Sequence, residues 1–288
     1  MKIEMAPSVV LENLEDLYFE LVPKHVDLKK KRPTYLSKEQ KRMTRLMGIE
    51  AVKEAISDID INKLKNIYLI GAEPLFNPDF NRILRFCLHF APTTVVTGGQ
   101  NINEKKARFL EKVQNERENN YLLKFNIILY HFDERINDTY CTRGDFRKVL
   151  HAVDSLQKYN FEPDILIKNI TNTPEIELVE GFEKVFSQYG INLPKIIVHS
   201  QAESEPDITK MNFLTLAKRL HCAKSRVFSS SGVFSCPILV GDNRARMGTT
   251  LKDYSKTNYL ETESCKTCIY REMNCLEECN DKQKVNSL

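Results

Sequence analysis

Residues 66–80 read NIYLIGAEPLFNPDF, an apolar run followed by a small-residue turn, one carboxylate and two prolines. The apolar run over residues 66–70 is short and contains β-branched residues, which is typical of a buried strand. Glu73 follows this run by three residues, where a carboxylate can cap the helix expected from about Asn77 or contact a ligand. The stretch therefore predicts a strand, a turn and a helix, with Glu73 at the carboxyl end of the strand.

Similar apolar runs recur through the first 200 residues, and segments of helical period separate them. Phe146, Leu150 and Val153 recur at spacings of four and three, and Ser37 is expected to begin a helix. Six runs are expected to be strands: residues 8–12, 66–70, 93–97, 125–130, 164–168 and 195–199. Strands that alternate with helices pair in parallel through right-handed crossovers, so the pattern predicts an α/β fold with a (β/α)6 sheet, either an open barrel or doubly wound. Ligands bind at the carboxyl ends of the strands in both folds, and Glu73 lies at such an end.

The periodic pattern stops near residue 200, and this change predicts three parts. Residues 1–200 are expected to form the (β/α)6 domain, and residues 201–221 a polar linker with a bridging helix. Residues 222–288 are expected to form a small cysteine-rich domain that binds metal.

Composition excludes several classes of protein. A hydrophobic share of 42% with 28% charged residues is typical of a soluble globular protein. The net charge of +3 comes from 42 basic and 39 acidic residues that are interspersed, which argues against nucleic acid as a partner. The first residues lack the apolar core of a signal peptide, and no stretch approaches the ~18 apolar residues of a membrane span. We therefore expect a cytoplasmic protein without a membrane partner.

Cysteines are distributed unevenly, because six of the eight lie after residue 220. The six are Cys222, Cys236, Cys265, Cys268, Cys275 and Cys279. Clustered thiolates in a reducing compartment indicate metal binding, and zinc and iron–sulfur clusters both accept four of them, so the spacing alone does not choose between the two. Cys87 and Cys141 are isolated and are expected to be core or near-surface residues.

Three segments of the first 200 residues resemble motifs of one enzyme family. They are Gly71-Ala72-Glu73-Pro74-Leu75 followed by Asn77-Pro78-Asp79-Phe80, then Thr97-Gly98-Gly99, and then Phe132-Asp133-Glu134 with Asp138 and Arg143-Gly144-Asp145-Phe146. They look like the corresponding segments of the radical SAM superfamily, whose fold is a partial (β/α)6 TIM-like barrel. The resemblance implies that Gly71, Ala72, Glu73 and Thr97 contribute to a site for S-adenosylmethionine, where the first segment binds the methionyl amine.

The C-terminal region resembles the SPASM or twitch-type extension of that superfamily. Cys222, Gly232 to Pro237, Arg246-Met247-Gly248 and the last four cysteines carry the likeness. The resemblance implies an auxiliary [4Fe–4S] cluster, although six cysteines are too few for two clusters with all-cysteine ligation. One arrangement uses Cys222, Cys236, Cys265 and Cys268 for a single cluster, as in a twitch domain. The other divides 222/236/279 from 265/268/275 in the SPASM order. We expect one cluster, with zinc as the alternative metal.

The family's catalytic motif is missing. Members carry Cys-x3-Cys-x2-Cys just after the first strand, where three thiolates hold the [4Fe–4S] cluster that cleaves the cofactor. If residues 8–12 are the first strand, the three positions fall near Leu17, Leu21 and Lys24, and no cysteine precedes Cys87. Glu20 and His25 are expected to be surface residues rather than iron ligands. Because iron normally supplies much of the grip on S-adenosylmethionine, the resemblance implies weak binding of that cofactor here.

Three functions remain open at this point, and no residue is assigned a catalytic role. The first is a pseudoenzyme that has lost the catalytic cluster, keeps a metal-bearing tail and binds a peptide or protein, or supports an active radical SAM paralogue, in a peptide, protein or cofactor modification pathway. The second is an active radical SAM enzyme with unorthodox cluster ligation. The third is a binder of S-adenosylmethionine without radical chemistry. The missing motif favours the first.

Overall fold

The computed structural model describes residues 7–23, 45–116, 121–200, 220–262, 264, 265 and 268. The chain forms two compact units. The β/α unit comprises Phe19–Glu54 and Lys65–Gln201, and the cysteine unit comprises Met1–Tyr18, Ala55–Leu64 and Ala202–Leu288. Each unit therefore joins segments that are distant in the sequence, and the two are described separately.

The β/α unit is built on strands that lie side by side in the order of the sequence. These are β2 (Asp16–Val22, whose first three residues belong to the cysteine unit), β3 (Asn66–Gly71), β4 (Thr93–Thr97), β5 (Leu123–Leu129), β6 (Asp164–Asn169) and β7 (Ile196–Ser200). Every pair from β3 to β7 is parallel. A doubly wound sheet would reverse its strand order at one point, so the sequential order identifies the barrel type of winding.

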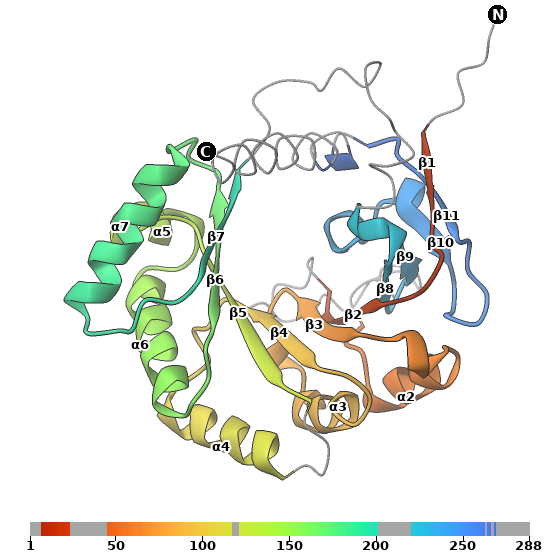
Figure 1. Cartoon of the computed structure of the whole chain (residues 1–288), viewed down its shortest axis with the longest axis horizontal. Coiled ribbons are helices and arrows are strands. Elements are labelled where there is room, and N and C mark those ends of the chain that lie inside the picture. The colour runs from red at the N-terminus through yellow and green to blue at the C-terminus, as the bar shows by residue number, and fades with distance from the viewer. Residues whose placement is uncertain are drawn as a thin grey trace, which may run out of the picture. The chain divides into compact units, whose positions relative to one another are not determined.

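Helices follow the strands along the chain. They are α2 (Ile49–Ser57), α3 (Phe80–Cys87), α4 (Glu104–Asn115), α5 (Glu134–Tyr140), α6 (Asp145–Lys158) and α7 (Glu175–Gln188), with short 3-10 helices η1 (Ile61–Lys63) and η2 (Pro74–Phe76). Helices α3, α4, α6 and α7 lie along one face of the sheet (Figure 1). The strands alternate accordingly, because β5 buries Leu123, Phe125, Ile127 and Leu129 while the residues between them are more exposed.

The cysteine unit contains short antiparallel strands. Strand β1 (Ser8–Val10) pairs with β11 (Thr257–Tyr259), while β9 (Gly232–Phe234) pairs with both β8 (Ser225–Ser229) and β10 (Arg246–Gly248). Three 3-10 turns accompany them: η4 (His221–Ala223), η5 (Pro237–Leu239) and η6 (Asn243–Ala245). The first described residues of the chain therefore belong to the same unit as Cys222, Cys236, Cys265 and Cys268.

The expectation that residues 8–12 form the first strand of the parallel sheet was wrong. The structure places β1 against β11 in the cysteine unit, and β2 occupies the position beside β3 instead. The sequence did not indicate β2, because Asp16 begins it and Glu20 interrupts its apolar run. Both residues are nevertheless buried, at 4% and 3% exposed. A strand that is covered on both faces lacks the alternation by which strands are recognised.

The expected domain limits differ from the compact units in one respect. The break near residue 200 lies next to the boundary between Gln201 and Ala202, but residues 1–18 and 55–64 group with the C-terminal region. The helix expected to begin near Ser37 and most of the bridging helix lie outside the described residues. In the described part of the chain, the helices are too short or too polar for any of them to cross a membrane.

Candidate functional site

The turn after β3 is shaped by a close approach of two backbones. Gly71 has a φ of 139°, and a Cβ at this position would collide with the carbonyl oxygen of Val22 at the end of β2. The next residue, Ala72, donates its backbone N–H to the same Val22 oxygen at 2.8 Å. Only glycine tolerates both this conformation and this contact. Gly71 therefore determines the position of the Glu73 carboxylate, two residues later.

Glu73 is held by donors from two strand ends. Its Oε1 and Oε2 both lie 2.7 Å from the Thr97 hydroxyl, which donates to the carboxylate from the end of β4. The backbone N–H of Gly98 donates to Oε2 at 3.1 Å, and that of Leu75 donates to Oε1 at 3.2 Å. Glu73 is thus the N-cap of η2 rather than of a helix near Asn77, and it also joins β3 to β4. The structure brings together Glu73 and Thr97, the two polar members of the predicted cofactor site.

Burial makes this carboxylate unusual. Glu73 is 6% exposed, and burial raises its pKa above the ordinary value of 4.5, while the bonds from Thr97, Leu75 and Gly98 act in the lowering direction. A carboxylate offers about four acceptor positions, so three donors leave about one for a further group. An ammonium group fits the remaining acceptor position, because it brings a positive charge and N–H donors to a desolvated carboxylate. The residues present at this strand end are therefore compatible with the amine of S-adenosylmethionine.

Asn77 links the two ends of the chain segment between β2 and α2. Its Nδ2 donates to the carbonyl oxygens of Leu21 and Met47, both at 2.8 Å, and its Oδ1 accepts from the backbone N–H of Asp79 at 2.8 Å. Asp79 in turn accepts from the N–H of Ile49 at the start of α2, at 3.2 Å. The Asn-Pro-Asp sequence therefore joins the two ends of the chain segment that leaves β2. Sequence reasoning had placed this triplet in a family motif without giving it a task.

The motif after β5 is mainly a set of helix caps. Asp133 accepts from two backbone N–H groups in the first turn of α5, at 2.8 and 3.1 Å. Asp138 accepts from the backbone N–H of Gly144 and from that of Phe146 at 3.0 Å, which covers the start of α6. These carboxylates are occupied by backbone donors, so the motif orders the chain between β5 and α6.

His131 is a residue at the carboxyl end of β5 that sequence reasoning missed. It is 5% exposed, and its Nδ1 accepts from the backbone N–H of Asp133 at 2.9 Å, which places the proton of the neutral ring on Nε2. Burial lowers its pKa, against the opposing charges of Asp133 and Glu177. A lone histidine after an apolar run carries no sequence signal that separates it from a core residue.

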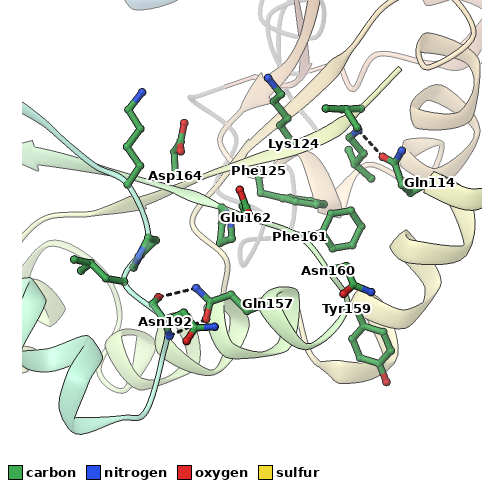
Figure 2. A pocket seen from close by; sticks show the side chains of 16 residues that line it. Gln114, Lys124, Phe125, Gln157, Tyr159, Asn160, Phe161, Glu162, Asp164 and Asn192 are labelled. Carbon is green, nitrogen blue, oxygen red and sulfur yellow. Dashed lines mark hydrogen bonds between the residues drawn. The ribbon is translucent and has the colours of Figure 1, made fainter. Parts of the chain in front are cut away.

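A depression of about 890 Å³ lies at the opposite end of the strands (Figure 2). It is lined by residues at the amino ends of β5 and β6, including Lys124 and Asp164. Gln157 exchanges hydrogen bonds with the backbone of Asn192 there, at 2.7 and 3.0 Å. This pair joins helix α6 to the chain that precedes β7, and ligands of parallel β/α sheets bind at the other end of the strands.

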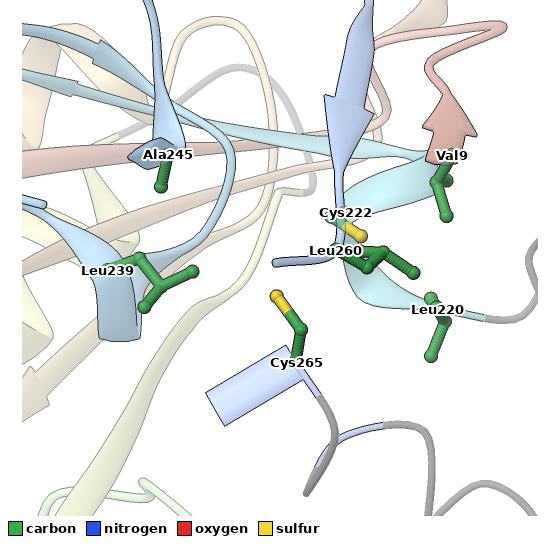
Figure 3. Close-up of a cluster of buried hydrophobic side chains, with 7 residues drawn as sticks. All are labelled: Val9, Leu220, Cys222, Leu239, Ala245, Leu260 and Cys265. Carbon is green, nitrogen blue, oxygen red and sulfur yellow. The ribbon is translucent and has the colours of Figure 1, made fainter. Parts of the chain in front are cut away.

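Four of the six predicted metal-ligating cysteines meet in the cysteine unit. Cys222 and Cys265, each 8% exposed, belong to a buried apolar cluster with Val9, Leu220, Leu239, Ala245 and Leu260, and Figure 3 shows both sulfurs turned into it. Cys236 and Cys268 pack against the same cluster. Cys275 and Cys279 lie outside the described residues. This is the set that the sequence analysis considered for a single twitch-type cluster.

Three of these sulfurs receive hydrogen bonds. The Thr262 hydroxyl donates to Cys265 Sγ at 3.2 Å, and the backbone N–H of Ile238 donates to Cys236 Sγ at 3.4 Å. The Asn258 side chain bonds to Cys222 and lowers the pKa of that thiol, although burial is the larger influence and raises it to about 11. Donors directed at sulfur favour thiolates, and soft thiolates are the preferred ligands of iron–sulfur clusters, so the donor set fits such a group. Within the described ranges, no three His, Cys, Asp or Glu side chains are arranged as they would be around a single metal ion.

The two remaining cysteines behave as expected. Cys87 is fully buried in α3, where burial raises the pKa of its thiol, and Cys141 is half-buried with its pKa raised to about 11 by burial. Both lie in the β/α unit, in sequence segments separate from the cluster described above.

The corrected strand assignment moves the position of the missing family motif. Leu17 and Leu21 lie within β2 and are fully buried, and Lys24 is not among the described residues. Glu20 is also buried in β2, so the expectation of a surface residue was wrong, while His25 lies outside the described part. The segment that follows the first strand of the sheet is residues 23–48, and its sequence contains no cysteine.

A sequence comparison identifies a superfamily, and comparisons with solved structures show a shared fold. The family model described as Radical SAM superfamily matches residues 27–182, more than half of the chain. Native anSMEcpe with bound AdoMet and the Cp18Cys peptide superposes with a TM-score of 0.56 at 16% identity, covering 87% of this chain and 81% of that chain. The same protein with AdoMet alone gives a TM-score of 0.56 at 17% identity, with the same coverage. No protein of curated function matches the sequence.

Proposed function

The chain belongs to the radical SAM superfamily, and on that premise we propose that it is a pseudoenzyme of the superfamily. It lacks the catalytic [4Fe–4S] cluster, binds a peptide or protein at the carboxyl ends of its strands, and carries one auxiliary cluster in the cysteine unit. The observation that supports this function most directly is the cysteine-free segment between β2 and α2.

The argument depends on where the segment lies. The chain leaves the sheet at Val22 and reaches α2 at Ile49, and Asn77 bonds to the backbone at both ends of this interval. These contacts support the proposal that this interval corresponds to the family's cluster-binding loop, and its sequence has other residues in place of the thiolates. Cleaving a sulfonium by one-electron reduction requires a low-potential cluster bonded to the cofactor, and the side chains of residues 23–48 offer no thiolate to hold one.

A peptide or protein is the class of ligand that we propose for the strand ends. The structurally similar anSMEcpe binds a peptide, and its fold overlaps most of this chain. A pseudoenzyme of this kind can present the bound peptide to an active radical SAM paralogue, which would supply the chemistry. A cytoplasmic location is part of the same proposal.

Anaerobic reconstitution with iron and sulfide tests the loss of catalysis. After reduction with dithionite, the protein should contain about four irons and should form no 5′-deoxyadenosine from S-adenosylmethionine. The matched comparison is a variant with a Cys-x3-Cys-x2-Cys motif introduced into residues 23–48, which should bind additional iron. Formation of 5′-deoxyadenosine by the natural sequence would refute the proposal and would favour an active enzyme with unorthodox cluster ligation.

The geometry at Glu73 favours a second function, in which S-adenosylmethionine binds without being cleaved. The expectation of weak binding rested on the lost iron, and it finds no support in structural neighbours that hold this cofactor. The carboxylate is already fixed by Thr97, Gly98 and Leu75, so a ligand amine would meet an ordered acceptor. Titration calorimetry should then show binding that Glu73→Gln weakens at least about tenfold, as expected for a hydrogen bond to a charged group.

A matched control uses a carboxylate away from this site. Glu50 lies in the first turn of α2 with a side chain that is 75% exposed, so Glu50→Gln should leave the affinity unchanged. Equal affinity in the Glu73→Gln variant and the natural protein would show that Glu73 is only a cap of η2.

A further inference from the structure

Arg226 is a fully buried cation in strand β8. Its guanidinium donates to backbone oxygens, from Nη1 to Cys222 at 2.8 Å and to Ser225 at 2.7 Å, and from Nη2 to Lys256 at 2.8 Å. Its third nitrogen, Nε, is buried and has no hydrogen-bond partner among the described residues. The described partners of this side chain are therefore carbonyl groups, which carry no net negative charge.

The described residues around Arg226 supply no counter-charge. In the part of the chain that the structure describes, no carboxylate forms an ion pair with Arg226. Its aromatic neighbour Tyr254, with the ring centre 5.8 Å from the guanidinium carbon, offers only the weak attraction of a π face. Burying an unpaired charge is strongly unfavourable, so a fully buried arginine implies an anion in its surroundings.

The neighbouring cysteines identify the class of anion. Arg226 bonds to the backbone of Cys222, and the Asn258 side chain bonds to the sulfur of the same residue. A [4Fe–4S] core held by four thiolates is anionic overall, because the thiolates carry more negative charge than the core carries positive charge. The cationic side chain and the amide donor therefore converge on one ligand of the proposed cluster.

We propose that Arg226 and Asn258 form a positively polarised shell around Cys222 that balances the charge of the auxiliary cluster and raises its reduction potential. The inference depends on the proposed cluster in the cysteine unit and assigns a task to residues that would not themselves bind iron. Reduction adds one electron to an anionic centre, so a nearby positive charge and an N–H donor to sulfur both stabilise the reduced form. Arg226 is a positioning and charge-balancing residue in this proposal.

The test is a redox titration of the reconstituted full-length protein, followed by visible absorption and electron paramagnetic resonance. Arg226→Gln removes the charge but keeps an amide that can donate to the carbonyl groups, whereas Arg226→Lys keeps the charge and loses the planar fork. The Gln variant should titrate at a more negative potential than the natural protein, and the Lys variant should stay close to it. Lys252→Gln, which removes an exposed cation from the same unit, is the control and should leave the potential unchanged.

Asn258→Leu keeps the test informative if Arg226→Gln does not fold. This variant leaves all the carbonyl bonds of Arg226 in place and removes only the donor to Cys222, so it should also shift the potential to more negative values. Equal potentials in the natural protein, Arg226→Gln and Asn258→Leu would overturn the inference while leaving the cluster itself established by its iron and sulfide content. A natural protein that takes up zinc instead, or no iron and sulfide, would overturn this inference together with the proposed auxiliary cluster, because such a site has no reduction potential to tune.

Discussion

Replacing Asn77 by alanine tests whether its side chain holds Leu21 and Met47 together, at the two ends of the segment between β2 and α2. The side chain is 3% exposed and makes three hydrogen bonds of 2.8 Å, to the oxygens of Leu21 and Met47 and from the N–H of Asp79. With about 1 kcal/mol for each bond lost, the free energy of unfolding should fall by about 3 kcal/mol. The corresponding midpoint of urea unfolding, followed by far-ultraviolet circular dichroism, should move down by about 1 M.

An isosteric variant sharpens this prediction. Asn77→Asp keeps the shape and the acceptor but directs a carboxylate at two carbonyl oxygens, so its loss of stability should grow as the pH rises and the new carboxyl group ionises. Asn192→Ala is the control, because that side chain is exposed and only its backbone bonds to Gln157, and the change should stay within about 0.5 kcal/mol. If Asn77→Ala lowers the free energy of unfolding by less than about 1 kcal/mol, the side chain does not hold the two ends of the segment together.

Three further changes probe the two sites. Gly71→Ala should lower the unfolding free energy by about 3 kcal/mol or more, measured by thermal melting, because its Cβ would meet the backbone oxygen at the end of β2. Glu73→Gln should gain in stability relative to the natural protein as the pH rises above 4.5, since the natural carboxyl has a raised pKa when folded and loses its stabilising contribution as it ionises; parallel pH curves for the two proteins would argue against this. Cys265→Ser combined with Cys268→Ser should abolish bound iron and destabilise the cysteine unit, whereas Cys87→Ser should keep the iron; unchanged iron in the double variant would exclude these ligands.

The parallel strands were readable from the sequence because each depends on local patterning. The five runs from residue 66 to residue 199 became β3 to β7, and their alternation with helices correctly predicted parallel pairing. The prediction of the first strand was wrong because both residues 8–12 and β2 could take that position, and the contact that decides between them, the pairing of β1 with β11, is distant in the sequence. Ser8 pairs with Tyr259, and no sequence pattern in residues 8–12 predicts a partner strand some 250 residues away.

The candidate sites divide in the same way. The family resemblance placed Glu73 and Thr97 in one cofactor site, and the structure brings them together because parallel strands end at a common edge. The buried state of Arg226 could not be predicted, since arginine is mostly exposed and its partners here are backbone oxygens from two separate segments. The bond from Asn77 to Met47 was equally hidden, because it spans 30 residues and its acceptor is backbone.

The pairing of β1 with β11 affects how the protein can be made. Strand β1 is synthesised long before its partner strand, Thr257–Tyr259. Val9, which is buried in one cluster with Cys222 and Leu220, is therefore synthesised long before these neighbours. The β/α unit can begin to assemble during that interval, whereas the cysteine unit can complete its core only after β11 has been synthesised. A recombinant fragment that starts at residue 202 would therefore lack one wall of that core and should be supplied with residues 7–18 to fold.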